Sequence, residues 1–184
     1  MMALDPRQAR LRADHDKLLT LQSTSPFVEI LEVRGTPPEE YVLLLKCKGI
    51  FRVFPNGSPE YSETHRLKVS LHPSYPRRIP ELQLLSPIWH PNINTQGGIC
   101  LGHEGERGYV PSMTLADLVV QIIQIIRYEN YSQQYYINLA AFNWAKKHTS
   151  LFPLDTSPIW DESLEIHILD ASSQGDLLGE ITIL

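Results

Sequence analysis

Cysteine is scarce in this sequence, with only Cys47 and Cys100 among 184 residues. Two cysteines form no disulfide framework, and they do not complete an all-thiolate zinc site. Such scarcity is typical of proteins from a reducing compartment, so we expect a cytoplasmic location.

Long apolar runs are missing as well. The most apolar stretch, residues 115–126, is interrupted by Asp117, Gln121 and Gln124, which makes it too short and too polar to span a bilayer. The first residues, Met-Met-Ala-Leu-Asp-Pro-Arg, lack the apolar segment of a secretion signal. We therefore expect neither secretion nor a membrane partner.

Positive charge is missing from one end of the chain. Residues 149–184 hold seven acidic residues and no Lys or Arg, whereas residues 1–148 hold all 16 Lys and Arg against 14 acidic residues. The nearly neutral body lacks the basic footprint of a nucleic-acid-binding protein. We expect two parts, a body over residues 1–150 and an acidic C-terminal extension over residues 151–184.

The overall composition, 42% hydrophobic and 20% charged, is that of a globular domain with a buried core. Apolar periodicity predicts an α+β fold in which a four-stranded antiparallel meander is flanked by helices. The predicted helices cover 5–21, 114–126 and 132–148. The predicted strands of the meander cover 27–33, 41–48, 64–71 and 81–86.

Local signals support these elements. Asp5 and Thr114 are suited to cap the first two helices, and Pro6 suits a first helical turn. Cys47 falls on the apolar face of the second strand, so we expect it in the core. The extension carries two further predicted strands, 164–169 and 177–183, that would form a β-hairpin.

The stretch with candidate chemistry is His90-Pro-Asn-Ile-Asn-Thr-Gln-Gly-Gly-Ile-Cys-Leu-Gly102. Cys100 lies on neither an alternating strand face nor a helical stripe, and the glycines around it let another backbone approach closely. A thiol with a pKa near ~8.5 is partly ionised at neutral pH and is a competent nucleophile. We therefore treat Cys100 as the candidate reactive group.

Three kinds of chemistry fit this stretch. A protease-like cysteine would use His90 or His103 as its base, oriented by a third group. A metal site would combine His90, Cys100 and His103, although the ligands are few and their spacing matches no common zinc pattern. Acyl transfer through a thioester would use Cys100 as nucleophile, with the Asn92 amide donating to the oxyanion.

The same stretch resembles the active-site region of ubiquitin-conjugating enzymes. The family's His-Pro-Asn tripeptide matches His90-Pro91-Asn92, and its catalytic cysteine, eight residues after the Asn in a Gly-x-Ile-Cys-Leu setting, matches Cys100. Further resemblance lies at Tyr75-Pro76, at Ile79-Pro80 and over residues 110–115. It extends over roughly residues 4–148.

This resemblance implies a ubiquitin-conjugating fold and a thioester mechanism. Cys100 would accept a ubiquitin-like modifier from an activating enzyme and pass it to an amine, with the side chain of a lysine as the expected acceptor, without a metal or an organic cofactor. Asn92 would support the oxyanion or hold the loop, and His90 and Pro91 would shape the loop. His103 would be a candidate to take the proton of the attacking amine.

The resemblance also implies docking surfaces. The helix face expected to meet the activating enzyme carries Arg7, Arg10 and Arg12. The surface expected to meet a ligase or target carries Arg77, Arg78 and Pro111.

The chain departs from the family pattern in places. Tyr109 is nearest to the position of the family's tryptophan, and the turn at 128–134 lacks the usual acidic, proline-rich gate, leaving Glu129, Asn130 or Ser132 to assist the amine. The acidic extension has no counterpart in the minimal family domain. This divergence favours a prokaryotic ubiquitin-like conjugation system, such as those of bacterial defence.

Two other functions stay open. A non-catalytic member of the family would bind a ubiquitin-like protein as a scaffold, although such members typically lack the cysteine. A thiol hydrolase of the modifier would need a true histidine base.

Overall fold

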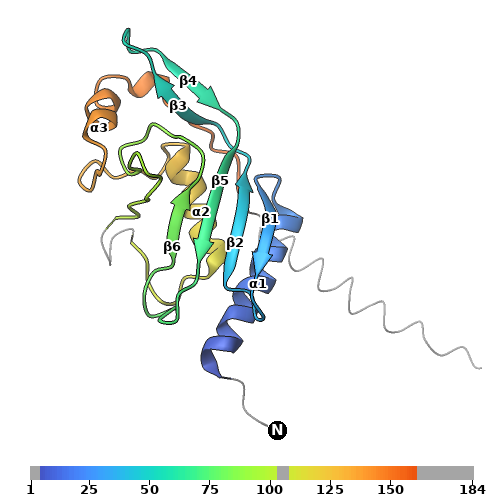
Figure 1. The fold of residues 1–184 in the computed structure, drawn as a ribbon. Coiled ribbons are helices and arrows are strands. Elements are labelled where there is room, and N and C mark those ends of the chain that lie inside the picture. The colour runs from blue at the N-terminus through green and yellow to red at the C-terminus, as the bar shows by residue number, and fades with distance from the viewer. Residues whose placement is uncertain (1–4, 103–107, 161–184) are drawn as a thin grey trace, which may run out of the picture.

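An antiparallel sheet in the order β1-β2-β5-β6 forms the centre of the fold, and two helices cover one of its faces (Figure 1). The structure, a computed structural model, describes residues 5–102 and 108–160. Its strands are β1 (Val28–Arg34), β2 (Glu40–Leu45), β3 (Gly49–Val53), β4 (Pro59–Ser62), β5 (His65–Ser70) and β6 (Glu81–Leu84). Its helices are α1 (Pro6–Thr24), α2 (Leu115–Ile126), α3 (Leu139–Ala145) and the short 3-10 helix η1 (Thr149–Leu151).

The main core lies between the sheet and helices α1 and α2. Tyr41, Leu43 and Leu45 alternate as the buried residues of β2, and Leu67 and Val69 do the same on β5. This alternation is what a strand with one covered face requires. None of the described helices is both long and apolar enough to cross a membrane.

The helix starts follow the sequence prediction. The Asp5 carboxylate accepts a hydrogen bond from the Arg7 backbone N–H at 3.3 Å, and Pro6 begins α1. Thr114 and Asp117 form a capping box at the start of α2, in which each side chain accepts from the backbone N–H of the other. These bonds satisfy N–H groups that have no partner inside the helix.

The four predicted strands of the meander are confirmed as β1, β2, β5 and β6. The sequence prediction missed β3 and β4, which form a separate two-stranded sheet inserted between β2 and β5. These strands are short, and β4 is half-buried throughout, so neither shows a clear alternation. The hairpin packs through Ile50 against Tyr128 and Trp144 in a second, smaller core.

The helix predicted over 132–148 is wrong in its first half, because only α3 is α-helical. The Asn138 side chain caps α3 and fixes its start. The preceding residues bond instead to the Asn92 side chain and the Pro91 carbonyl. These tertiary bonds compete with helix formation, and a local apolar pattern does not reveal them.

Part of the predicted extension packs on the body. Ile159 joins the main core, and Trp160 packs against it. Residues 161–184, with both strands predicted there, lie outside the described residues, and the domain boundary near residue 150 stays a prediction.

Arg127 holds the packed part of the extension in place. Its guanidinium is fully buried, lies 4.3 Å from the centroid of the Phe27 ring and pairs with the Asp155 carboxylate at 3.1 Å. It also donates to the backbone carbonyls of Asp155 at 2.9 Å and Ser157 at 3.0 Å. Because a buried charge is costly unless it is paired and hydrogen-bonded, the burial of Arg127 depends on this segment.

Arg127→Ala is expected to lower the free energy of unfolding by about 3 kcal/mol, since it deletes the guanidinium together with its hydrogen bonds to Asp155 and Ser157 and its contact with Phe27. Urea denaturation monitored by tryptophan fluorescence measures this loss. Lys147→Ala, at an exposed position, is the control and should change stability by less than about 0.5 kcal/mol. Equal effects of the two substitutions would contradict the role of Arg127.

Candidate active site

Cys100 lies in a loop that follows β6 and is anchored at two points. The Gly97 carbonyl accepts a hydrogen bond from the Leu84 N–H at 2.9 Å, which fastens the loop to β6. The Cys100 N–H donates to the Asn92 carbonyl at 2.8 Å. The backbone that leads up to the thiol is therefore held, while the Cys100 side chain is partly exposed.

Glycine is required at position 97. Its φ is +84°, and a Cβ there would lie 1.9 Å from the Leu84 carbonyl oxygen, far inside van der Waals contact. The Asn94 side chain completes this turn by accepting from the N–H groups of Gln96 and Gly98. The expected close approach of another backbone beside Cys100 is confirmed at Gly97.

The Asn92 side chain is buried and fully engaged. Its amide nitrogen donates to the carbonyls of Ser132 at 3.1 Å and Tyr135 at 2.9 Å, and its oxygen accepts from the Ser132 N–H at 2.9 Å. Both donor hydrogens are thus used within the protein. Of the two roles expected for Asn92, this geometry fits holding the loop.

His90 and Pro91 also belong to the framework of the loop. The His90 side chain is fully buried, its Nδ1 accepts from the Asn92 N–H at 3.0 Å, and its ring lies 4.3 Å from that of Tyr128. Burial lowers the pKa of His90 to about 3, so the ring is neutral at physiological pH. The Pro91 carbonyl accepts from two consecutive N–H groups, those of Ile137 and Asn138.

The two thiols have different environments. Cys47 is buried in the main core as expected, and burial raises the pKa of its thiol to about 12. Thiolate is the reactive form, so Cys47 is inert at neutral pH. Cys100 is the accessible thiol of the pair.

The other chemistries find little support in the described geometry. His90 has its Nδ1 bonded within the loop and is held neutral, so it is not arranged as the base of Cys100. His103 lies outside the described residues. Over residues 5–102 and 108–160, no three His, Cys, Asp or Glu side chains gather into a metal-binding group.

Of the three residues suggested to assist the amine, Glu129 and Ser132 make intramolecular contacts through their side chains. Glu129 lies 3.4 Å from Arg127, and burial raises the pKa of its carboxyl. The Ser132 hydroxyl accepts from the Tyr135 N–H at 3.1 Å. Asn130 lines an open cavity of about 630 Å³ beside α2.

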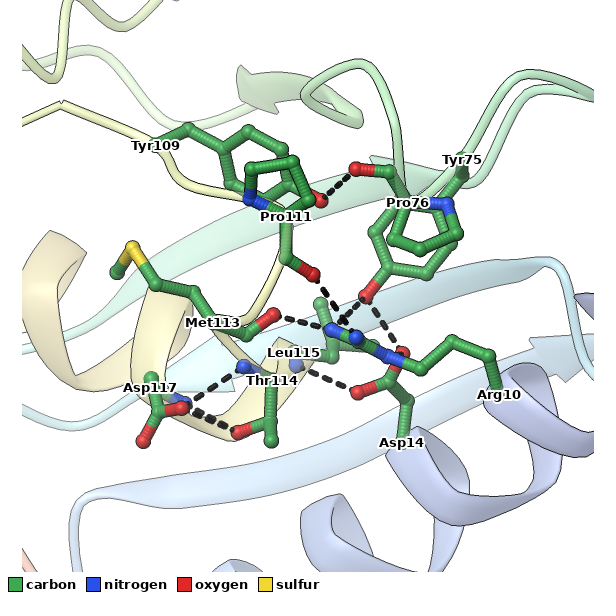
Figure 2. Close-up of polar contacts among 10 residues, drawn as sticks. All are labelled: Arg10, Asp14, Tyr75, Pro76, Tyr109, Pro111, Met113, Thr114, Leu115 and Asp117. Atoms are coloured by element: carbon green, nitrogen blue, oxygen red, sulfur yellow. Dashed lines mark hydrogen bonds and ion pairs between the residues drawn. The ribbon is translucent and has the colours of Figure 1, made fainter. Parts of the chain in front are cut away.

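Arg10 is half-buried and lies in a polar network that joins three parts of the chain (Figure 2). Its Nε donates to the Asp14 carboxylate at 2.7 Å, and its terminal nitrogens donate to the carbonyls of Pro111 and Met113. Tyr75 completes the network by donating its hydroxyl proton to Asp14 at 2.5 Å. This network fixes the 109–114 loop, which precedes α2, against α1.

The second oxygen of the Asp14 carboxylate contacts the start of α2. Asp14 Oδ1 accepts from the Leu115 N–H at 3.0 Å, while Tyr109 donates its hydroxyl proton to the Pro76 carbonyl at 2.5 Å (Figure 2). Tyr109, near the position of the family's tryptophan, thus ties the 109–114 loop to the loop between β5 and β6. The Tyr75-Pro76 step and residues 110–115, matched separately to the family, are brought together by this network.

The arginines predicted for docking differ in availability. Arg7 pairs with Glu39 at 2.8 Å, and Arg10 is bound to Asp14 in the network of Figure 2. The remaining residues predicted for docking are exposed; they are Arg12, Arg77, Arg78 and Pro111.

Sequence reasoning missed Asp14, the residue at the centre of this network. It lies on the stripe of α1 that also holds Leu11, Leu18 and Leu21, all of them buried. A carboxylate at such a position needs a partner, because an unpaired buried charge is strongly unfavourable. Its place among apolar residues at helical spacing was the signal that could have predicted it.

A helix-flanked antiparallel meander with a partly exposed cysteine after a His-Pro-Asn loop defines a ubiquitin-conjugating class of protein. Residues 44–152 match the family model of ubiquitin-conjugating enzymes, which is more than half of the chain, so the chain belongs to that family.

Proteins similar in sequence are named as ubiquitin-conjugating or NEDD8-conjugating enzymes. The chain is 28% identical over 98 residues to ubiquitin-conjugating enzyme E2 2 of Candida albicans, covering 53% of each protein. It is 30% identical over 129 residues to the NEDD8-conjugating enzyme ubc-12 of Caenorhabditis elegans, covering 66% of this chain and 61% of that one. The chain therefore spans between about half and three fifths of the length of these relatives.

Solved structures share the fold. Ubc12 of Saccharomyces cerevisiae gives a TM-score of 0.57 at 19% identity, covering 82% of this chain and 77% of that one. A putative ubiquitin-conjugating enzyme of Trypanosoma cruzi gives a TM-score of 0.54 at 17% identity, covering 81% and 94%. At these identities the similarity concerns the fold.

Stability is expected to fall in mild acid because His90 is held neutral. In the unfolded chain its pKa is ordinary, near ~6.5, and in the folded protein it is about 3. The unfolded state therefore binds more protons below pH ~6.5, and stability, complete above that pH, decreases towards pH 3 by about 1.4 kcal/mol per unit.

Urea denaturation at several pH values between about 7 and 5 measures this slope. His65, whose pKa burial lowers to about 4, contributes a similar slope. His90→Gln should remove about half of the combined slope. An unchanged slope in this variant would contradict the buried neutral state of His90.

Asp14→Asn is expected to lower the free energy of unfolding by about 3 kcal/mol, because it removes the buried charge that pairs with half-buried Arg10. Asp16→Asn, on the exposed side of the same helix, is the matched control and should have little effect. Thermal and urea denaturation of both variants measure the difference. Similar stability of the two variants would disprove the central place given to Asp14.

Proposed function

We propose that the protein carries a ubiquitin-like modifier as a thioester on Cys100 and transfers it to an amine, in agreement with its family. The observation that supports this most directly is the accessible Cys100 thiol on a backbone held by Asn92 and Gly97. A nucleophile fixed in this way needs little reorganisation before attack.

The proposed chemistry has two steps. The Cys100 thiolate attacks the carbonyl carbon of the thioester on the activating enzyme, a new C–S bond forms, and the enzyme's thiolate leaves and takes up a proton. The amine then attacks the same carbonyl carbon, a C–N bond forms, and the bond to Cys100 breaks. The amine loses its proton, and Cys100 is released as a thiol.

Asn92 is proposed as a positioning residue of this reaction. Its three hydrogen bonds fasten the Cys100 loop to the 132–135 segment. The side chain would need to give up a bond to Ser132 or Tyr135 before donating to an oxyanion. Its contribution is therefore the placement of the thiol against the segment where an amine would approach.

The surfaces proposed for partner proteins are those that carry exposed basic residues. Arg12 on α1 is exposed and suits the activating enzyme. Arg77, Arg78 and Pro111 are exposed on two loops that Tyr109 joins, and we propose this joined surface for a ligase or target. The modifier and the activating enzyme are the partners that the reaction itself requires.

Charging of Cys100 tests the proposal. The protein is incubated with ATP, an activating enzyme and its modifier, with ubiquitin and NEDD8 as the first two pairs, and examined on a non-reducing gel. We expect a thiol-sensitive adduct that Cys100→Ala abolishes and that Cys100→Ser converts to a thiol-resistant ester. Cys47→Ser, in the inert core position, is the control and should charge like the unchanged protein.

The outcomes separate the alternatives. Noncovalent binding of the modifier without an adduct would favour a scaffold. Cleavage of a modifier fusion without ATP would favour a thiol hydrolase. Loss of charging in a well-folded Cys47→Ser variant would overturn the assignment of the two thiols.

A further inference from the structure

A cleft of about 880 Å³ lies between the start of α1 and the loop that joins β5 to β6. Four guanidinium groups line it, and Asp5 is its acidic residue. The four are Arg7, Arg10, Arg77 and Arg78. A cleft with this charge attracts acidic groups.

The four arginines do not contribute equally. Arg7 is neutralised by Glu39 and Arg10 by Asp14. Arg77 and Arg78 are exposed and form no ion pair with a described residue. The cleft therefore has two available cations on the loop side, next to two that are held in position by their own partners.

The chain itself contains a segment of complementary charge. Residues 161–184 hold six acidic residues and no Lys or Arg. The three that come first are Asp161, Glu162 and Glu165. This is the most strongly acidic segment of the sequence, and it follows directly after the last described residue.

The point where this segment begins lies beside α1, the helix whose start lines the cleft. Trp160 packs against the main core, and Lys17 Nζ of α1 lies 5.5 Å from the centroid of its ring. Arg10 is two helical turns from Lys17 on the same side of α1, a distance of about 10 Å. The 24 residues of 161–184 can extend over up to ~80 Å, so their length does not restrict them from reaching the cleft.

We propose that the acidic segment 161–184 docks in this arginine cleft of its own chain, with its carboxylates paired to Arg77 and Arg78. Charge complementarity and the position of Trp160 favour this occupant over a separate acidic protein. Because the segment is tethered, its effective concentration at the cleft is high even if each ion pair is weak.

The docked segment would cover the surface proposed for a ligase or target. That consequence rests on the proposed function: a partner would have to displace residues 161–184 before it reached Arg77 and Arg78. The docking itself needs neither the modifier nor the activating enzyme, so it can be tested independently of conjugation.

Paramagnetic relaxation in the full-length chain tests the docking. A nitroxide is attached to Ser172→Cys in a Cys100→Ser background; Cys47 stays, because its burial and its pKa of about 12 protect it. In the ¹⁵N-labelled protein, we expect the amide signals of Arg77 and Arg78 to lose intensity at least about twofold relative to the reduced label, and to recover in about 0.5 M salt as screening increases.

Charge reversal supplies the matched comparison. Arg77→Glu/Arg78→Glu should abolish the broadening at neighbouring residues of the cleft. Lys146→Glu/Lys147→Glu, at the end of α3 on the far side of the molecule (Figure 1), should leave it unchanged. Broadening that survives the first pair, or that is absent from the cleft altogether, would overturn the proposal.

A mixing experiment excludes association between chains. Nitroxide-labelled, ¹⁴N protein is mixed with unlabelled ¹⁵N protein at the same total concentration. The intramolecular proposal predicts no broadening of the Arg77 and Arg78 signals in this mixture. Broadening equal to that in the chain that carries both the nitroxide and ¹⁵N would show that the acidic segment binds a second copy, which contradicts the proposal.

Discussion

The buried carboxylate of Asp14 is the contact on which the arrangement of the surrounding loops depends. It accepts hydrogen bonds from Arg10 and Tyr75 and from the first N–H of α2 at Leu115. A charge in the core is tolerated only when it is paired and its remaining lone pairs are used. This requirement joins α1, the loop after β5 and the start of α2 at one point (Figure 2), and Tyr109 extends the connection by bonding to Pro76.

The Cys100 loop depends on a second set of polar contacts with the same logic. Asn92 uses its whole side-chain amide to hold the segment at 132–135, and buried His90 accepts from the Asn92 N–H. Gly97 lets the loop lie directly on the β6 backbone. The backbone that leads up to the thiol is thus fixed from two sides while the side chain stays partly exposed, a combination suited to the nucleophile role proposed for Cys100.

The sequence predicted well those features that short-range patterns encode. Alternation identified the strands on either side of the β3–β4 hairpin, and Thr114 marked the start of α2. The prediction failed where distant residues compete for the backbone. Residues 132–138 have a helical apolar pattern, but the Asn92 side chain and the Pro91 carbonyl take their polar groups. The hairpin was missed because its strands are short and lack a consistently buried face.

The sequence by itself determined which thiol is the candidate nucleophile, because Cys47 alternates with buried strand residues and Cys100 follows a His-Pro-Asn tripeptide among glycines. It also determined the family resemblance, which depends on residue order and spacing. Only the tertiary structure decided which polar residues are free. Asn92, Arg7 and Arg10 look equally available in the sequence, yet each is bound within the protein, whereas Arg77 and Arg78 are exposed. The physical reason is that a hydrogen-bond partner far along the chain leaves no local pattern.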